Sequence, residues 1–253
     1  MKKSLLLINA FISLFGLIEP VAAQPETLAA ANDSWSAFLA LAVNETGEVD
    51  YAGLKATPAK QAGLEEYLAY LATVDLAALA SDQARLATLI NAYNAFAIDG
   101  VLSRYPITTV RGFLVQQFFR AREHQLAGRP ISLDQLEEQI RSYDEPRIHF
   151  AIVCASRSCP RLMNTAYRPA LLSEQLAQAA TEFARSPIQV RLQQTDKRCQ
   201  VAVNPIMKWY RDDWGTGTIA YLNQYRQEPL PADCRLSYFN YDWGLNRQAA
   251  KEL

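Results

Sequence analysis

Cysteine, histidine and net charge are all scarce in this chain of 253 residues. It contains four Cys and two His, and its formal net charge at pH 7 is −1. Four Cys are too few for a scaffold built from disulfides, and two His leave little material for a metal centre. The near-neutral charge provides no basic surface for nucleic acid. With 50% hydrophobic and 20% charged residues, the chain has the composition of an ordinary globular protein.

Several motifs that identify enzyme classes are missing from the sequence. There is no G-x-S-x-G elbow, no phosphate-binding loop and no G-x-G-x-x-G turn. No motif therefore supports a serine hydrolase or a nucleotide-binding function. The sequence also lacks C-x-x-C, H-E-x-x-H and EF-hand motifs. We therefore expect no metal site, no cofactor and no nucleic-acid partner.

The N-terminus has the layout of a secretory signal peptide, residues 1–23. Lys2 and Lys3 precede an apolar segment at 4–18, and small residues at 21–23 follow it. This pattern predicts cleavage after Ala23 and a periplasmic or secreted protein. The alternative is an uncleaved anchor, although the segment is short for a span of about 20 residues. We expect no integral span after cleavage, because no other segment approaches that length.

Residues 24–253 are predicted to form a single α+β domain. Helical periodicity dominates early and strands late, without the regular alternation of an α/β protein. The segment 86–98 is apolar nearly all round, which predicts a central buried helix with surrounding helices and a small, mostly antiparallel sheet. Other expected elements are a start of this helix after Ser81 or Asp82, helices opening at Asn32–Ser34, Ser132 and Pro169, a buried strand over 148–154, and a hairpin from 188–192 and 199–203.

Two amide side chains interrupt the apolar central helix. Asn91 and Asn94 are three residues apart and therefore share one face of the helix. A buried Asn has several donor and acceptor sites, and each costs about 1–3 kcal/mol if it is left unpaired. Either both amides bind the backbone of a crossing loop, as buried polar groups usually do, or they line a polar cleft.

One histidine and one cysteine belong to the same predicted strand. A Cys beside a His is the combination of an activated nucleophile, with imidazole as the base. His149 and Cys154 are five residues apart, so on a regular strand their side chains point to opposite faces, roughly 16 Å apart. A direct pair requires the chain to turn sharply after Val153, which the small residues Ala155 and Ser156 permit. The alternative is a structural histidine bonded to backbone.

The four cysteines also allow a structural interpretation. In an oxidising compartment they would form two disulfides, and three pairings are open. We favour Cys154 with Cys159, which closes a short loop, and Cys199 with Cys234, which joins two strand-like segments. A free Cys154 with a lowered pKa is the competing hypothesis.

Two further segments contain candidate binding residues. Glu137 lies one position from the apolar stripe of its predicted helix, so it faces either inward or the solvated flank. The segment 208–214 is dense in aromatic and charged residues. It would form a platform for a carbohydrate or peptide ligand, or a helix that buries Trp209 and Trp214 under paired charges.

Five short motifs occur together in this chain. They are I-N-A-Y-N-A at 90–95, S-L-D-Q-L-E at 132–137, R-I-H-F-A-I-V-C-A-S-R-S-C-P at 147–160, K-W-Y-R-D-D-W at 208–214 and Y-D-W-G-L-N at 241–246. Together they resemble the domain of unknown function 547 family. The resemblance spans roughly residues 80–246 and implies an exported bacterial protein. It points to Asn91, Asn94, Glu137, His149, Cys154, Ser156 and Lys208, but assigns them no roles.

The candidate residues support three functional hypotheses. In the first, Cys154 as nucleophile and His149 as base catalyse hydrolysis or acyl transfer on a cell-envelope or peptide-like substrate. Glu137 and both amides would border the cleft, and backbone N–H groups of 155–158 would stabilise the oxyanion. In the second, the same cleft and Trp209 bind a small-molecule, peptide or glycan ligand without chemistry. In the third, the motif residues only hold the core together.

Overall fold

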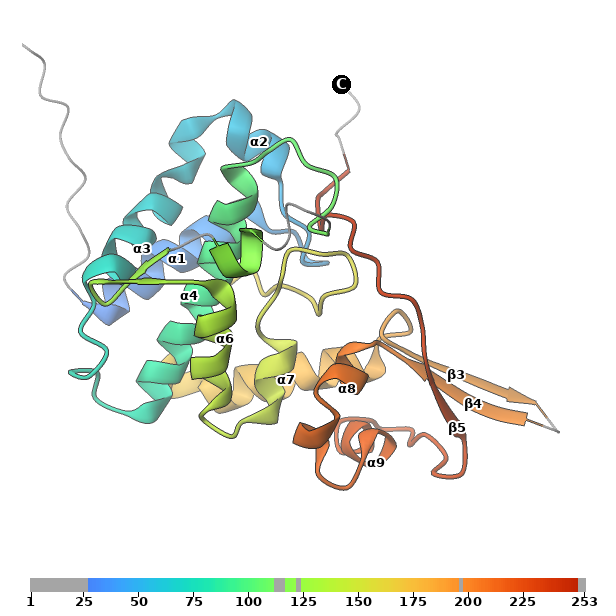
Figure 1. Cartoon of the computed structure of the whole chain (residues 1–253). Helices are drawn as coiled ribbons and strands as arrows, with labels where there is room; N and C mark the ends of the chain where they lie inside the picture. Colours follow the sequence, from blue (N-terminus) through green and yellow to red (C-terminus); the bar gives the residue numbers. More distant parts are fainter. Residues whose placement is uncertain (1–26, 112–116, 122–123, 196–197, 250–253) are drawn as a thin grey trace, which may run out of the picture.

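The computed structural model describes residues 27–111, 117–121, 124–195 and 198–249 (Figure 1). The predicted signal peptide, residues 1–23, lies outside them. Within the described residues, helices surround one long central helix, and the strands form a hairpin and a three-stranded sheet. The fold class is therefore α+β, as the sequence predicts.

The helical part of the fold is built around α4 (Asp82–Leu102). Ser81 caps α4, because its hydroxyl accepts a hydrogen bond from the Ala84 N–H at 3.1 Å. Nearly all residues of α4 are buried, as its apolar sequence predicts. The helices around it are α1 (Leu28–Ala42), α2 (Tyr51–Ala56), η1 (Pro58–Gln61), α3 (Ala62–Thr73) and α6 (Leu133–Arg141), followed by η3 (Pro146–Phe150), η4 (Pro169–Leu171) and α7 (Leu172–Arg185).

Two small elements precede α6. A π-helical turn, η2 (Gln117–Ala121), comes first, and the hairpin β1 (His124–Leu126) and β2 (Arg129–Ile131) follows it. The predicted start of α6 is confirmed, because the Ser132 hydroxyl accepts from the Gln135 N–H and the Gln135 side chain accepts from the Ser132 N–H. This reciprocal cap fixes the residue at which α6 begins.

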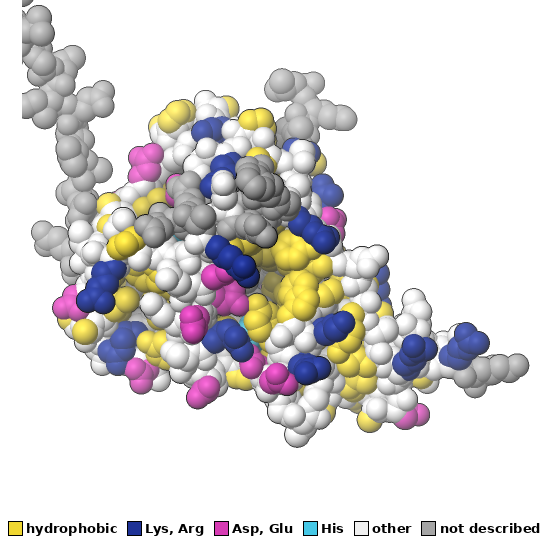
Figure 2. Space-filling view, viewed as in Figure 1, with side chains coloured by type: hydrophobic (Ala, Val, Ile, Leu, Met, Phe, Trp, Pro, Cys, Tyr) yellow, Lys and Arg dark blue, Asp and Glu magenta, His cyan; other side chains and the backbone are white. Residues whose placement is uncertain are grey.

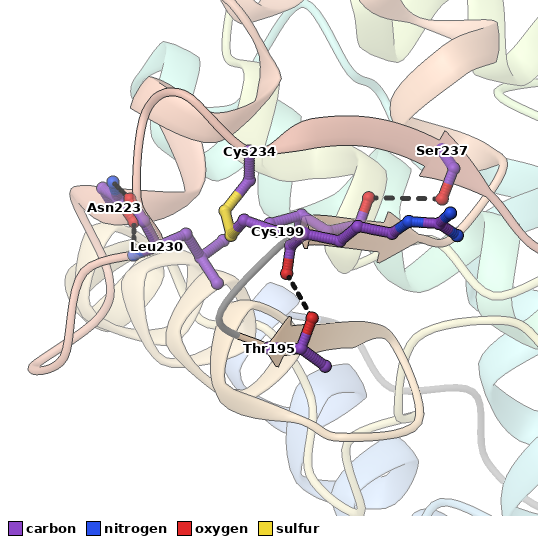
Figure 3. Close-up of a disulfide and its surroundings, with 8 residues drawn as sticks. Thr195, Cys199, Asn223, Leu230, Cys234 and Ser237 are labelled. Carbon is purple, nitrogen blue, oxygen red and sulfur yellow. Dashed lines mark hydrogen bonds between the residues drawn. A yellow bond between two sulfur atoms is a disulfide. The ribbon is translucent and has the colours of Figure 1, made fainter.

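The C-terminal part packs a second apolar cluster against α7. Its sheet has the order β3 (Val190–Thr195), β4 (Arg198–Val203), β5 (Arg235–Tyr238). The predicted β3–β4 hairpin is antiparallel, whereas β4 and β5 run parallel. The predicted disulfide between Cys199 and Cys234 ties β4 to the start of β5 (Figure 3). The remaining elements are α8 (Ile206–Trp209), η5 (Arg211–Trp214) and α9 (Thr218–Asn223).

Two predicted elements differ from the structure. Residues 148–154 form no strand: the chain makes the short helix η3 and then an irregular segment. The Val153 N–H donates to the Asn94 side chain at 2.9 Å, so a side-chain amide replaces the neighbouring strand that backbone groups normally need. Helix α1 begins earlier than predicted, since Thr27 caps it and Asn32 lies inside it, buried.

After β5, the chain runs back across the helical part (Figure 1). The N–H of Val49 donates to the carbonyl of Asn246 at 2.9 Å, and the N–H of Gln248 donates to the carbonyl of Val49 at 3.1 Å. The segment also contacts the loop after Cys154, where the N–H of Asn246 donates to the carbonyl of Ala155 at 3.0 Å. The last residues of the described chain thus meet elements from its first half.

Candidate functional site

A cavity of about 350 Å³ opens between α6 and α8. Figure 2 shows a hollow near the middle of the visible face, bordered by hydrophobic side chains on one side and acidic side chains on the other. A volume of this size suits a small ligand. Its lining, here called the aromatic cavity, consists of Tyr93, Phe119, Asp134, Glu137, His149, Ile152, Cys154, Cys159, Ile206, Trp209, Tyr210, Tyr241 and Trp243.

A larger depression of about 1080 Å³ lies between the end of α3 and the β1–β2 hairpin. Among the described residues, its lining contains no Cys, no His and no aromatic side chain. It therefore offers neither a nucleophile nor a ring surface. The aromatic cavity is the stronger candidate, because four sequence-predicted residues meet there: Glu137, His149, Cys154 and Trp209.

Helix α6 supplies the carboxyl group of Glu137 to the cavity wall. Its neighbours Leu136 and Ile140 are fully buried in the core, and Glu137 lies at the edge of that buried face. The hydroxyl of Tyr210 donates a hydrogen bond to Glu137 Oε1 at 2.5 Å. Burial raises the pKa of the Glu137 carboxyl, and this hydrogen bond offsets only part of the increase. Glu137 thus faces inward rather than the solvated flank.

His149 lies in η3, with its ring stacked on Tyr210 at 3.8 Å between centroids. Its Nε2 is 2.7 Å from Asp213 Oδ2, while Nδ1 is buried and has no hydrogen-bond partner among the described residues. Burial lowers the pKa of His149 to about 4, against the raising effect of Asp213. At neutral pH the imidazole is therefore uncharged. Because a carboxylate only accepts, the proton lies on Nε2 and Nδ1 keeps a lone pair.

Cys154 and Cys159 are free thiols in this structure, so the predicted disulfide between them is not formed. The N–H of Cys154 donates to Cys159 Sγ at 3.0 Å. The Ser156 hydroxyl lies 3.3 Å from Cys154 Sγ and 3.4 Å from Cys159 Sγ. The Tyr241 hydroxyl lies 3.5 Å and 3.2 Å from the same two sulfurs. Two thiols and two hydroxyls therefore form one compact cluster at the cavity wall.

The two thiols differ in acidity. Burial raises the pKa of Cys159, but hydrogen bonds from Cys154, Ser156 and Tyr241 outweigh it and lower that pKa to about 6. The hydrogen bond with Cys159, together with burial, raises the pKa of Cys154 well above its usual value. The sequence-based hypothesis assigned the lowered pKa to Cys154. The structure assigns it to Cys159, because the donors converge on that sulfur.

The predicted pairing of His149 with Cys154 is not made. Both residues line the aromatic cavity, but His149 Nε2 bonds Asp213 and Cys154 Sγ bonds the hydroxyl cluster. The backbone N–H groups of Arg157 and Ser158 donate to carbonyls within 242–244, at 2.7 and 3.2 Å. Those two donors are therefore occupied and do not form the predicted oxyanion site.

The amides of the central helix lie outside the aromatic cavity. Asn91 donates to the carbonyl of Tyr167 at 2.8 Å and accepts from its N–H at 2.9 Å. Asn94 likewise donates to the carbonyl of Ala151 at 3.0 Å and accepts from the Val153 N–H at 2.9 Å. Both side chains bind the backbone of crossing segments, which is the structural alternative stated for them.

The other predicted binding residues have separate positions. Ser156 is fully buried within the thiol cluster. Lys208 is exposed and lies outside the lining of the aromatic cavity, with its ammonium group 5.8 Å from the ring centroid of Tyr238. Trp209 is 48% exposed and stacks near Trp243, with 5.8 Å between the ring centroids. Of these three residues, only Trp209 offers a surface to a ligand in the aromatic cavity.

Nine of the thirteen lining residues escaped the sequence-based selection of site residues, and five of these nine contribute a ring or a thiol from a quoted motif. Four of these five are aromatic, and each occurs within one of the motifs quoted above. The sequence signal that could have identified these aromatic residues was the recurrence of Tyr and Trp inside motifs that also contain candidate polar residues. The five are Tyr93, Cys159, Tyr210, Tyr241 and Trp243.

The described residues provide no obvious metal centre. None of their His, Cys, Asp and Glu side chains gather in groups of three or more that could hold a metal ion. None of the helices among them has the length and apolar character needed to cross a membrane.

The fold and the aromatic cavity define an α+β structure with two carboxyl groups and two thiols in a ring-lined pocket. Residues 77–184 match the family model described as Protein of unknown function, DUF547, so this segment of the chain is similar to that family. The match includes α4, α6 and the loop with both thiols, but ends before Trp209 and Tyr241. No curated protein and no solved structure matches the chain.

Proposed function

We propose that this protein binds a small organic cation in the aromatic cavity. The observation that carries the proposal is the composition of the lining: six aromatic rings and two carboxyl groups, with no Lys or Arg among the described lining residues. Aromatic faces attract cations electrostatically, most strongly where water is excluded. A neutral apolar ligand would gain nothing from the carboxyl groups, and an anion would be repelled by them.

The ring surface comes from three side chains that pack on one another. Tyr241 and Trp243 lie 4.5 Å apart between centroids, and Trp209 lies 4.9 Å from Tyr241. Trp209 is about half exposed, so a face of its indole remains for a ligand. A quaternary ammonium group suits such a wall, because it is bulky and carries no hydrogen-bond donor that needs a fixed acceptor.

Glu137 is the carboxyl group best placed to complement the cation. Asp134 already pairs with Arg120, with 2.9 Å between Oδ2 and Nε. Among the described residues, the hydrogen-bond partner of Glu137 is the hydroxyl of Tyr210, and burial raises the pKa of the Glu137 carboxyl. A bound cation would supply the missing positive charge and favour the ionised carboxylate. Binding should therefore strengthen as pH rises through the raised pKa of Glu137, with the charges of Asp134 and Arg141 also acting on this carboxyl.

We favour binding over acyl transfer for this cavity. The catalytic hypothesis needs His149 beside Cys154 and free N–H donors around 155–158. His149 is engaged with Asp213, and the N–H groups of Arg157 and Ser158 donate to backbone carbonyls. The predicted signal peptide would place a binding function of this kind in the periplasm or outside the cell, where the ligand would be met.

The test compares choline with 3,3-dimethylbutanol, its uncharged carbon isostere, by calorimetry and tryptophan fluorescence. Choline should bind at least about ten-fold more tightly than the isostere, because only the cation interacts with the rings and with Glu137. Equal affinity would show an apolar pocket without charge preference. Absence of binding by choline and by the bulkier benzyltrimethylammonium ion would reject the proposal.

Two matched variants locate the charge effect. Glu137→Gln should weaken choline binding about ten-fold and remove its pH dependence, since it deletes the ionisable group in the wall. Glu138→Gln removes the same charge from the next residue of α6, which is exposed and lies outside the aromatic cavity. It should leave choline affinity unchanged. Equal losses in both variants would indicate a general charge effect rather than a cation site.

A further inference from the structure

The thiols of Cys154 and Cys159 are neighbours at the cavity wall. Both sulfurs lie within 3.5 Å of the Ser156 and Tyr241 hydroxyls, and these two hydroxyls are 2.9 Å apart. The two thiols also form a side-chain hydrogen bond with each other, so the sulfurs are direct neighbours. The 3.0 Å contact from the Cys154 N–H to Cys159 Sγ brings the second sulfur against the backbone of the first cysteine.

The loop between the cysteines is held in this shape by the rest of the fold. Ala155 adopts a left-handed conformation with φ of 63°, which turns the chain directly after Cys154. The N–H of Cys159 donates to the carbonyl of Ser156 at 3.1 Å, which closes a tight turn. The N–H of Asp242 donates to the Ser158 hydroxyl at 2.8 Å and fastens the loop to the C-terminal segment. The fold thus holds the sulfurs together before any bond forms between them.

The two sulfurs also differ in acidity, which gives them different roles in thiol exchange. Burial raises the pKa of Cys159, but the hydrogen bonds that it accepts lower the pKa by more, to about 6. Cys154 keeps its proton, because the hydrogen bond with Cys159 and burial raise its pKa. A thiolate next to a protonated thiol is the arrangement of an attacking cysteine with a resolving partner.

We propose that Cys159 and Cys154 form a dithiol–disulfide exchange site for low-molecular-mass disulfides that enter the aromatic cavity. The Cys159 thiolate attacks one sulfur of the small disulfide, whose S–S bond breaks and releases one thiolate. Cys154 then gives its proton to the first departing thiolate and attacks Cys159 Sγ in the mixed disulfide, which releases the second sulfur as a thiolate that takes its proton from solvent. The small disulfide is reduced to two thiols, and the protein dithiol is oxidised to a Cys154–Cys159 disulfide.

The chain's other cysteine pair has a different role. Cys199 and Cys234 are already joined, and their bridge connects β4 to the start of β5. Neither of them lines the aromatic cavity. Exchange should therefore occur at Cys154 and Cys159 while the Cys199–Cys234 disulfide persists, which makes that disulfide an internal reference in each experiment.

The experiment follows the reaction with bis(2-hydroxyethyl) disulfide, a neutral probe that does not depend on the proposed cation site. Cys154→Ser should accumulate a mixed disulfide on Cys159, because the resolving thiol is missing. Cys159→Ser should react at least about ten-fold more slowly. The wild-type protein should end with an internal Cys154–Cys159 disulfide and no adduct, as mapped by peptide mass spectrometry.

Three results would overturn the proposal. They are equal rates for the two variants, a lasting adduct on the wild-type protein, and reaction only after denaturation. Thermal melting and circular dichroism check that each variant is folded, and Cys154→Ala and Cys159→Ala provide a second pair if a serine variant is not. Each result distinguishes a working dithiol from two merely buried cysteines.

Tyr241→Phe tests the positioning residue. It removes a hydroxyl that lies 3.2 Å from Cys159 Sγ, so the midpoint of the pH–rate profile should move upward from about 6. Other titratable groups acting on the thiolate are Cys154, Tyr51 and Tyr93, whose own pKa values are raised, so they stay neutral in this range. A purely structural tyrosine would leave the midpoint unchanged, and that result would reject the proposed thiolate.

Discussion

Two sets of buried polar groups meet near the segment 151–154, and they differ in how completely they are hydrogen-bonded. The first set is the Asn94 amide with its backbone partners, and the second is the polar groups at the aromatic cavity. Asn94 bonds the carbonyl of Ala151 and the N–H of Val153, so its amide is matched to backbone groups. Cys154, the next residue, bonds side-chain hydroxyls and faces the aromatic cavity. In the same cavity, His149 Nδ1 has no partner among the described residues. Burial alone therefore does not identify a site. Polar groups that are incompletely paired and that border open space do.

Removing an amide from the first set should produce the largest loss of stability. Asn94→Ala would leave the Ala151 carbonyl and the Val153 N–H buried without their partner. At about 1–3 kcal/mol for each of these two unpaired groups, the free energy of unfolding should fall by about 2–6 kcal/mol. Chemical denaturation measures this change, and choline binding by the folded fraction should persist.

Thr88→Ala is the matched control for Asn94→Ala on the same helix. Its hydroxyl donates to the carbonyl of Ala84 at 2.8 Å, one turn earlier in α4. That carbonyl still has its helical partner after the substitution, so the loss should be about 1 kcal/mol. Equal losses in the two variants would contradict a special role for Asn94 in holding the segment 151–154.

The second set, through His149, should make the free energy of unfolding depend on pH. The pKa of His149 is about 4 in the folded protein, below the unfolded value of about 6.5, so the unfolded state binds more protons between these limits. Stability from the neutral ring is complete above about pH 6.5. It declines as pH falls toward about 4, by about 3 kcal/mol in total.

His149→Gln isolates this contribution. The variant lacks the titrating ring, so the difference in unfolding free energy between it and the wild-type protein should shrink as pH falls from about 6.5 to about 4. Denaturant unfolding at several pH values measures the difference. A constant difference across this range would mean that His149 keeps an ordinary pKa and that its surroundings are more solvated than the structure indicates.

Trp209→Ala should have the smallest effect on stability and a large one on binding. Its side chain is 48% exposed, so the free energy of unfolding should change by about 1 kcal/mol or less. Trp214→Ala, at 1% exposure in the same segment, should cost about 3–5 kcal/mol. Thermal melts and choline titrations of the two variants separate the roles. If Trp209→Ala retained its choline affinity, the idea that the Trp209 ring contacts the cation would be rejected.

Elements with strong local signals were predicted well from sequence. The start of α4 follows from Ser81 as a cap before an apolar run, and α6 follows from the capping box of Ser132 and Gln135. The prediction of a strand over 148–154 was wrong for a specific reason. Its apolar run is typical of a strand, but Asn94 satisfies its backbone groups from another element, and a propensity for local structure contains no information about such a partner.

The candidate site was predicted only in part. Glu137, His149, Cys154 and Trp209 meet in the aromatic cavity, whereas Asn91, Asn94 and Lys208 do not. Residue type was enough to nominate a Cys and a His as reactive. Which cysteine would carry the lowered pKa depended on donors from Ser156 and Tyr241, and Tyr241 is more than eighty residues away in the chain.

Short-range patterns were sufficient for the fold class, the central helix and the β3–β4 hairpin, because caps, periodicity and turns act within a few residues. The cavity depended on contacts that no local pattern contains. Its two carboxyl groups come from α6 and its thiols from the segment 154–159. Its rings come from α4, from η2, from the end of α8 and from the segment after β5. Those pieces meet because the C-terminal segment packs back onto the helices, and the acidity of the thiols follows from that packing.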